Sequence, residues 1–502
     1  MIDLNRIIST FSLEEKQKFV AYLTQKNKRK DAKNIKLFKL ISKGELDSKA
    51  LSVSLYGKEK SNAYHALRKR LYEAIVDFTA NEQLTDEHST EMTLIKYILS
   101  ARSFLQQQQY QIAFKILDKA EKTAKAQQLF PYLNEIYQTQ IQYAHYIPEL
   151  DLDLLIKKAE HNAHLKKQED QLNTIYARVR QTLNAITYQG KVIDLEAILI
   201  QNFNDYQEHF MKQLSFKSLY QLVRMASIFA FATKNYLNIE SFLLKTYQHL
   251  TSRETTKEQL VYHIEVLYQI ANTLFRNKKF LESLNYLELM KAEMLKKNKK
   301  NYHNYKLKYR LLQCLNLNYT KQQDQAIKIL EQNYQVKTAD YESILDIHLC
   351  LITCYVQQQA FKKALAVFAK FHHSDQWYTQ KAGKEWVLKK NIIEIILHIE
   401  LGHTDLVESR FRSFKRQHYK YLKENNQDRV IKFLRFVESY YKTPETITSN
   451  QFKSKVEDTF EWIDAKQEDI FVMSFYAWLK SKMEQKDLYE CTLELIEKAR
   501  ER

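Results

Sequence analysis

The residues whose spacing best suits metal chemistry are His348, Cys350 and Cys354. The two cysteines are four residues apart, which places them on one face of a helix, and thiolate and imidazole groups are ligands that zinc prefers. Leucine and isoleucine occupy the positions between them, however, and a free cysteine in an apolar stretch is commonly a small core residue. We therefore expect this group to be buried packing and not a metal centre.

The remaining histidines and charged residues form no catalytic pattern. The pair His372–His373, and His398 with His403, have no carboxylate or thiolate partners at a useful spacing. The sequence also has no glycine-rich phosphate loop and no His-Glu-x-x-His zinc motif. We expect a protein that is not an enzyme, with no catalytic, cofactor-binding or metal-binding residues and no cofactor.

Positive charge is concentrated in three segments of this basic chain. The formal net charge is +17, and residues 1–80 carry +8, residues 291–310 carry +7 and residues 408–423 carry +5. Local basic clusters indicate an anionic partner such as nucleic acid, the ribosome or an acidic protein surface. A basic helix face is also commonly no more than solvated, and the sequence leaves both interpretations open.

Residues 1–80 have the pattern closest to a nucleic-acid-binding domain. A short helix over residues 49–56 ends at Gly57, and a long basic helix starts near Ser61. This order is that of a helix-turn-helix module, and residues 35–80 resemble such a module in bacterial regulators that also carry helical repeats. No strand pair for a wing follows Ala80, and the turn is longer than in the tight form. The candidate phosphate contacts are Lys28, Arg29, Lys30, Arg68, Lys69 and Arg70.

Composition favours helices throughout. The chain has five glycines and three prolines in 502 residues. Hairpin turns between strands consume glycine, so this scarcity predicts an all-α fold with helix content well above half and essentially no strand. A hydrophobic share of 45% is typical of a folded chain.

The sequence shows no signal for export or membrane insertion. No run of about 18 uncharged apolar residues occurs, so we expect no spanning segment. The first residues include acidic side chains and no apolar signal core. The four cysteines show no disulfide framework, which favours a reducing, cytoplasmic location.

The elements that position these residues follow a hairpin pattern, clearest in residues 266–290. Apolar residues recur three and four apart from Leu267 to Leu274, a polar break covers residues 277–279, and a second apolar face runs from Phe280 to Met290. Two amphipathic helices joined by a short break form an antiparallel hairpin. One hairpin cannot bury its apolar face alone and needs copies on either side. Further turns fall near residues 236, 323, 361 and 404, at spacings of 38 to 44 residues.

These copies resemble tetratricopeptide repeats, in which a small residue lies where the paired helices touch and an aromatic residue lies at the turn. The residues that carry the resemblance are Tyr97, Ala101, Phe104, Tyr110, Ala113, Leu117 and Ala120, then Ala271, Leu274, Phe280, Ser283 and Leu287, then Tyr355, Phe361, Ala364 and Phe368. The resemblance covers residues 91–442 and implies an α-solenoid that binds partners in a concave groove. Because the spacing exceeds the family's period of about 34 residues, we expect longer helices.

The chain is thereby predicted to have four parts. These are a basic helical domain (1–80), a polar linker (81–90), the tetratricopeptide-like solenoid (91–442) and C-terminal capping helices (451–502). Within the solenoid we expect a further helix over residues 191–210.

Two functional hypotheses follow. The resemblance implies a groove lined by the first helix of each hairpin, and aligning the hairpins places there Arg102, Arg224, Asn272, Phe275 and Arg276. Basic and amide side chains suit a carboxylate-bearing peptide, so the first hypothesis is an adaptor or scaffold that binds a protein or peptide partner, preferentially an acidic one. The second is a regulator, or a ribosome- or RNA-associated factor, that contacts DNA or RNA through its N-terminal domain.

Overall fold

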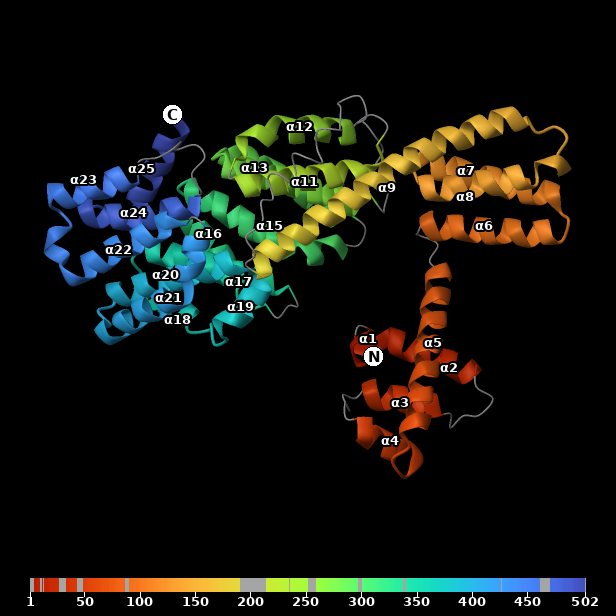
Figure 1. Cartoon of the computed structure of the whole chain (residues 1–502), viewed down its shortest axis with the longest axis horizontal. Coiled ribbons are helices and arrows are strands. Elements are labelled where there is room, and N and C mark those ends of the chain that lie inside the picture. Colours follow the sequence, from red (N-terminus) through yellow and green to blue (C-terminus); the bar gives the residue numbers. More distant parts are fainter. Residues whose placement is uncertain are drawn as a thin grey trace. The chain divides into compact units, whose positions relative to one another are not determined.

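All regular elements of the described chain are helices (Figure 1), which confirms the predicted all-α class. The structure is a computed structural model that describes residues 4–9, 11, 13–26, 33–42, 48–85, 90–189, 214–233, 235–251, 259–296, 300–336, 340–425, 427–460 and 470–501. No strand occurs in these ranges, and none of their helices has the length and apolar character needed to cross a bilayer. The helix predicted over residues 191–210 lies outside them.

The described residues form two units. One comprises the chain up to residue 126 together with residues 131–159, and the other comprises residues 127–130 and the chain from residue 160. The first unit contains α1 (Leu4–Ser9), α2 (Leu13–Lys26), α3 (Lys33–Ser42), α4 (Ser48–Tyr56), α5 (Ser61–Thr85), α6 (Thr90–Gln106), α7 (Tyr110–Ala126) and α8 (Phe130–Gln142), a short 3₁₀ helix (Ala144–Tyr146) and the start of α9 (Leu152–Gln189).

The second unit holds the rest of α9 and the later helices. These are α11 (Phe216–Thr233), α12 (Leu237–Thr251), α13 (Leu260–Arg276), α14 (Phe280–Leu295), α15 (Lys300–Tyr319), α16 (Gln323–Glu331), α17 (Tyr341–Gln357), α18 (Phe361–Phe368), α19 (Asp375–Ala382), α20 (Lys384–Glu400), α21 (Thr404–Glu424), α22 (Asp428–Lys442), a 3₁₀ helix (Pro444–Thr446), α23 (Asn450–Thr459), α24 (Ile470–Glu484) and α25 (Leu488–Glu501).

The N-terminal helices α1 to α5 enclose a separate aromatic core. Phe19 is fully buried, and its ring centroid lies 4.8 Å from that of Phe38 and 5.1 Å from that of Phe78. Gly57, with a φ of 76°, closes α4 in the left-handed conformation that glycine adopts without steric cost. Because α5 continues to Thr85, residues 81–85 of the predicted linker are helical.

The later helices pack in neighbouring pairs whose turns agree with the repeat pattern. The second helices of five pairs begin at residues 237, 280, 323, 361 and 404, where the sequence predicts turns at 236, 280, 323, 361 and 404. The pairs are α11–α12, α13–α14, α15–α16, α17–α18 and α20–α21. The first helices of the pairs also contact one another in sequence, α11 with α13, α13 with α15, and α15 with α17.

Small residues lie where the paired helices touch, as the pattern requires. Ala113, Ala271, Ser283 and Ala364 are each fully buried. The Ser283 hydroxyl donates a hydrogen bond of 2.8 Å to the Ala271 carbonyl across the α13–α14 contact. A larger side chain at these positions would separate the two helices.

The hairpin turns share one backbone geometry. The residue two before the second helix has a positive φ in several hairpins, for example Gln108 (58°), Lys321 (62°) and Gln359 (56°). The amide of the next residue then bonds back to the preceding helix, as from Ala360 to the Tyr355 carbonyl at 2.8 Å. This left-handed turn satisfies carbonyls that a helix end leaves free.

The last two helices pack back onto the middle of the second unit. The Tyr489 hydroxyl on α25 donates to the Asn318 carbonyl at 2.6 Å, and Trp478 Nε1 on α24 donates to Glu400 at 2.7 Å. The helices predicted to cap the chain therefore contact α15 and α20.

Candidate functional site

The group with metal-like spacing lies inside the apolar packing of α17. Cys350 and Cys354 are buried, and His348 Nδ1 lies 2.7 Å from the Ile344 carbonyl of its own helix. The hydrogen bond with Cys354, together with burial, raises the pKa of the Cys350 thiol. The part of the chain that the structure describes holds no cluster of three or more potential metal-ligating side chains.

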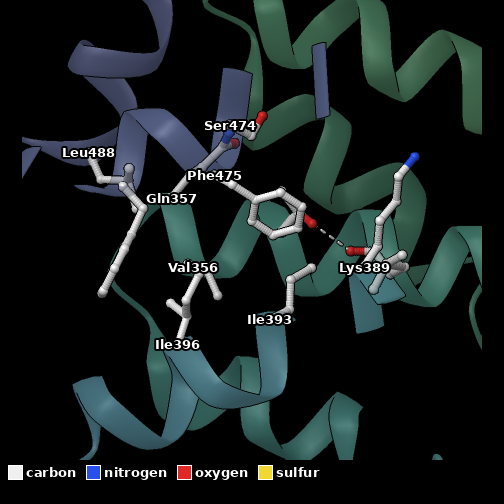
Figure 2. A pocket seen from close by; sticks show the side chains of 11 residues that line it. Val356, Gln357, Lys389, Ile393, Ile396, Ser474, Phe475 and Leu488 are labelled. Carbon is white, nitrogen blue, oxygen red and sulfur yellow. Dashed lines mark hydrogen bonds between the residues drawn. The ribbon is translucent and has the colours of Figure 1, made fainter. Parts of the chain in front are cut away.

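A small pocket near the same helix belongs to the packing as well. It has a volume of about 30 Å³ and lies between α17, α20 and α24, with Leu488 of α25 at its edge. Figure 2 shows that Phe475, Ile393 and Val356 converge on it from different helices. This volume holds about one water molecule, so the pocket is too small for a metabolite.

Three of the predicted groove residues lie together in the second unit. Arg224 on α11 and both Asn272 and Arg276 on α13 are half-buried. Phe275 is only 1% exposed, and its ring packs 5.8 Å from that of Phe280. The alignment is therefore wrong for Phe275, because the side chain turns into the hairpin core. Arg102 is on α6 in the first unit, where it pairs with Glu135.

Arg224, Asn272 and Arg276 belong to a larger row of polar side chains on the first helices. We call it the polar face. Its members are Tyr220 and Arg224 on α11, Glu265, Tyr268, Asn272 and Arg276 on α13, Tyr305 and Lys308 on α15, and Glu342 and Asp346 on α17. Because carboxylates alternate with cations, the face carries both signs of charge and offers no preference for a purely acidic partner.

Sequence reasoning missed the tyrosines and carboxylates of the polar face. A signal was present, since polar residues recur four apart at 268, 272 and 276, and at 342 and 346, on helices that are otherwise apolar. Such spacing marks one stripe of a helix, but it does not say which stripes of different helices meet.

Neighbouring groups on the polar face perturb one another. Burial, together with the charge of Glu342, raises the pKa of Asp346 to about 7, although Lys389 and Arg276 act in the opposite direction. Burial also raises the pKa of Tyr268 and of Tyr305, so both phenols are neutral hydrogen-bond donors at physiological pH.

The second half of α9 lies across the polar face. Gln221 on α11 donates to the Asn173 side chain at 2.7 Å, and Arg224 interacts with the Tyr176 hydroxyl. At the far end, the Tyr188 hydroxyl interacts with Glu342 of α17. The same helix thus reaches from α11 to α17 over the first-helix side of the pairs.

The predicted nucleic-acid contacts are only partly within the described residues. Lys28, Arg29 and Lys30 lie outside them. Lys69 and Arg70 are exposed on α5, whereas Arg68 is half-buried with its guanidinium carbon 5.7 Å from the Tyr64 ring centroid.

Several aromatic residues of the other two basic segments point inward. Tyr309 is fully buried and donates to Glu288 at 3.1 Å. On α21, Phe411 and Phe414 are buried, while the cations of the opposite face are exposed, namely Arg412, Arg416, Lys420 and Lys423. Tyr309, Phe411 and Phe414 thus serve packing, and the exposed cations of α21 face solvent.

Comparison with known proteins does not assign the chain to a family, because no protein-family model and no curated protein sequence matches it. The candidate site therefore rests on geometry alone.

Proposed function

We propose that this chain is a non-enzymatic adaptor, built as a tetratricopeptide-like α-solenoid, that binds a protein partner on the polar face. The stacked pairs, the coincidence of the turns with the repeat pattern and the buried small residues at the pair contacts support the solenoid. Consecutive first helices then line one continuous surface, as in other solenoids.

The observation that carries the proposal is the composition of the polar face. Four successive first helices contribute tyrosines, carboxylates, an amide and cations to one row, and on α13 and α17 most of the other positions are apolar. A row of this kind provides directional hydrogen bonds along an extended partner, and tyrosine and arginine are the side chains most enriched in binding hot spots.

Affinity capture with matched variants tests the proposal. The face variant combines Asn272→Ala with Arg276→Ala, and the control combines Lys321→Ala with Lys328→Ala, two exposed residues of the α15–α16 pair. We expect specific polypeptides to be captured by the wild type and the control and lost with the face variant. Equal capture by all three chains would exclude the polar face as the binding surface.

Nucleic-acid binding is a second candidate function, which the exposed cations of α5 and α21 favour. Lys69 and Arg70, and the row Arg412, Arg416 and Lys423, point to solvent without an ion-pair partner in the described structure. Nuclease digestion of the purified protein, followed by its ultraviolet absorbance ratio, separates the two candidates. An absorbance ratio that falls after digestion and removal of the released nucleotides supports nucleic acid, and an unchanged ratio supports the adaptor.

A further inference from the structure

The last turns of α9 occupy the polar face as a ligand would. We call residues 173–189 the α9 tail. Its apolar and aromatic positions, Tyr176, Val179, Leu183 and Ile186, recur three and four apart and pack against the core of α11, α12 and α13. This spacing is that of an amphipathic helix in a hydrophobic groove.

The polar contacts of the α9 tail reach Gln221, beside the polar face on α11, and residues at both ends of the polar face. Asn173 accepts from Gln221, Tyr176 interacts with Arg224, and Tyr188 interacts with Glu342. A helical partner bound at this face can therefore make apolar contacts along one stripe of its surface and hydrogen bonds beside that stripe.

A glycine permits the close approach of the tail's end. A Cβ atom at Gly383, between α19 and α20, would lie 2.9 Å from the Thr187 Cγ2 and 3.2 Å from the Thr187 carbonyl oxygen. The surface against which the tail packs thus lacks a side chain at Gly383, and this allows the helix backbone at Thr187 to approach closely.

The C-terminal half of the tail nevertheless buries few side chains. Val179 is fully buried, but between residues 180 and 188 every side chain is half-buried or exposed. In α13, by contrast, most side chains over residues 263–275 are buried. Segments with few buried apolar contacts open at low free-energy cost.

We propose that the α9 tail occupies the polar face as an intramolecular ligand and that a partner displaces it. The partner is an amphipathic helix with the same apolar spacing and a terminal tyrosine. This inference rests on the proposed adaptor function and names its partner class. The partner inserts its apolar stripe against α11 and α13 and offers its tyrosine hydroxyl to Glu342.

Peptide binding to the full chain tests the inference. The probe is a fluorescein-labelled peptide with the sequence of residues 170–189, and the variant carries Leu183→Gln and Ile186→Gln to loosen the tail. We expect the variant to bind the probe at least about tenfold more tightly than the wild type in fluorescence anisotropy. A probe with the same two substitutions should not bind, and Asn272→Arg in the loosened chain should abolish binding.

Two results would overturn the inference. One is the absence of probe binding to a loosened chain that keeps its helix content, and the other is equal binding to the wild type and the loosened chain. If the loosened chain does not fold, amide hydrogen exchange of the wild type decides: amides of residues 181–188 should exchange at least about tenfold faster than those of α13, and equal protection would refute the proposal. Equal capture of polypeptides by the wild type, the face variant and the control would contradict the adaptor function and leave the peptide-binding result intact.

Discussion

At the scale of single residues, small buried side chains occupy the contacts between paired helices. Ala113 on α7 and Ala364 on α18 are fully buried, and both were identified from the repeat pattern. Neighbouring positions on the same helices, Gln111 and Ala366, are exposed. A substitution at the exposed position of each helix therefore serves as the control for the same substitution at its buried position.

We predict that Ala113→Arg and Ala364→Arg destabilise the protein strongly. Each change overpacks a helix contact and buries a charge, at a cost on the order of 3 kcal/mol or more. Thermal unfolding followed by circular dichroism should show a clear loss of stability for both, whereas Gln111→Arg and Ala366→Arg should melt like the parent. Parental melting of the buried variants would show that these contacts are misassigned.

Asp346 gives the polar face a measurable pH dependence. Its folded pKa of about 7 is raised, first by burial and then by Glu342, above an unfolded value of about 4. As pH rises from about 4 to 7, the unfolded chain loses this proton before the folded chain does, so the carboxyl lowers stability over that range.

We predict that Asp346→Asn stabilises the protein at pH 8 by at least about 1 kcal/mol and has little effect near pH 4. Urea unfolding at the two pH values measures the difference. Because Glu342, Asp340 and Tyr188 face Asp346, as do Lys389 and Arg276, the comparison is made between variant and parent at each pH. An offset of equal size at both values would argue against a raised pKa.

At the scale of elements, the turns explain how a chain with five glycines forms so many hairpins. Glutamine or lysine occupies the left-handed position in most of the described turns, and glycine occupies it at Gly402. An L-residue in this conformation costs about 1–2 kcal/mol. The repeated geometry persists because helix pairing on both sides determines it.

We predict that Gln359→Gly raises stability by about 1 kcal/mol, because glycine adopts its φ of 56° without steric cost. The control is Gln358→Gly, where φ is −82°. There glycine adds unfolded-state entropy and removes the 2.8 Å hydrogen bond from the Gln358 side chain to Asp324, so stability should fall. Differential scanning calorimetry compares the two. A lower melting temperature for Gln359→Gly would mean that the 3.4 Å hydrogen bond from the Gln359 side chain to Asp487 stabilises the protein by more than the strain costs.

The elements were largely predictable from sequence, and their partners were not. The starts of α14, α16, α18 and α21 agree with the prediction because aromatic and apolar periodicity is a local signal. The 38-residue helix α9 contains none of the residues that carry the repeat resemblance. Its place on the polar face depends on contacts between residues about 50 to 200 positions apart. Phe275 was misassigned for the same reason, since helical spacing alone does not show which face meets a neighbour.

At the scale of the whole molecule, the uneven distribution of positive charge leads to a salt-dependence test that distinguishes the two candidate functions. The nucleic-acid hypothesis predicts binding to DNA or RNA that weakens steeply as salt rises, because phosphate contacts release counterions. Glutamine at six positions should abolish this binding. Of these, Lys69 and Arg70 are exposed, and because exposed charges add little stability, we expect the fold to stay intact. The positions are Lys28, Arg29, Lys30, Arg68, Lys69 and Arg70.

Filter binding at several salt concentrations provides the measurement, and the matched control places glutamine at Arg412, Arg416 and Lys423 on α21. Binding lost only in the control would move the nucleic-acid surface to α21. A parent that shows no salt-sensitive binding to either polymer would leave the adaptor function alone.

The contact between Tyr489 and the Asn318 carbonyl sets an order of events during synthesis. The two residues are 171 positions apart, and at about 5–20 residues per second the ribosome adds the second roughly 10–30 s after the first. Until then α24 and α25 do not cover the C-terminal end of α15. In the folded protein the Ser474 hydroxyl of α24 lies 3.2 Å from the Tyr319 hydroxyl at this end. Over that interval the nascent chain leaves this end of α15 uncovered, and a chaperone that binds it would act before α24 and α25 have packed there.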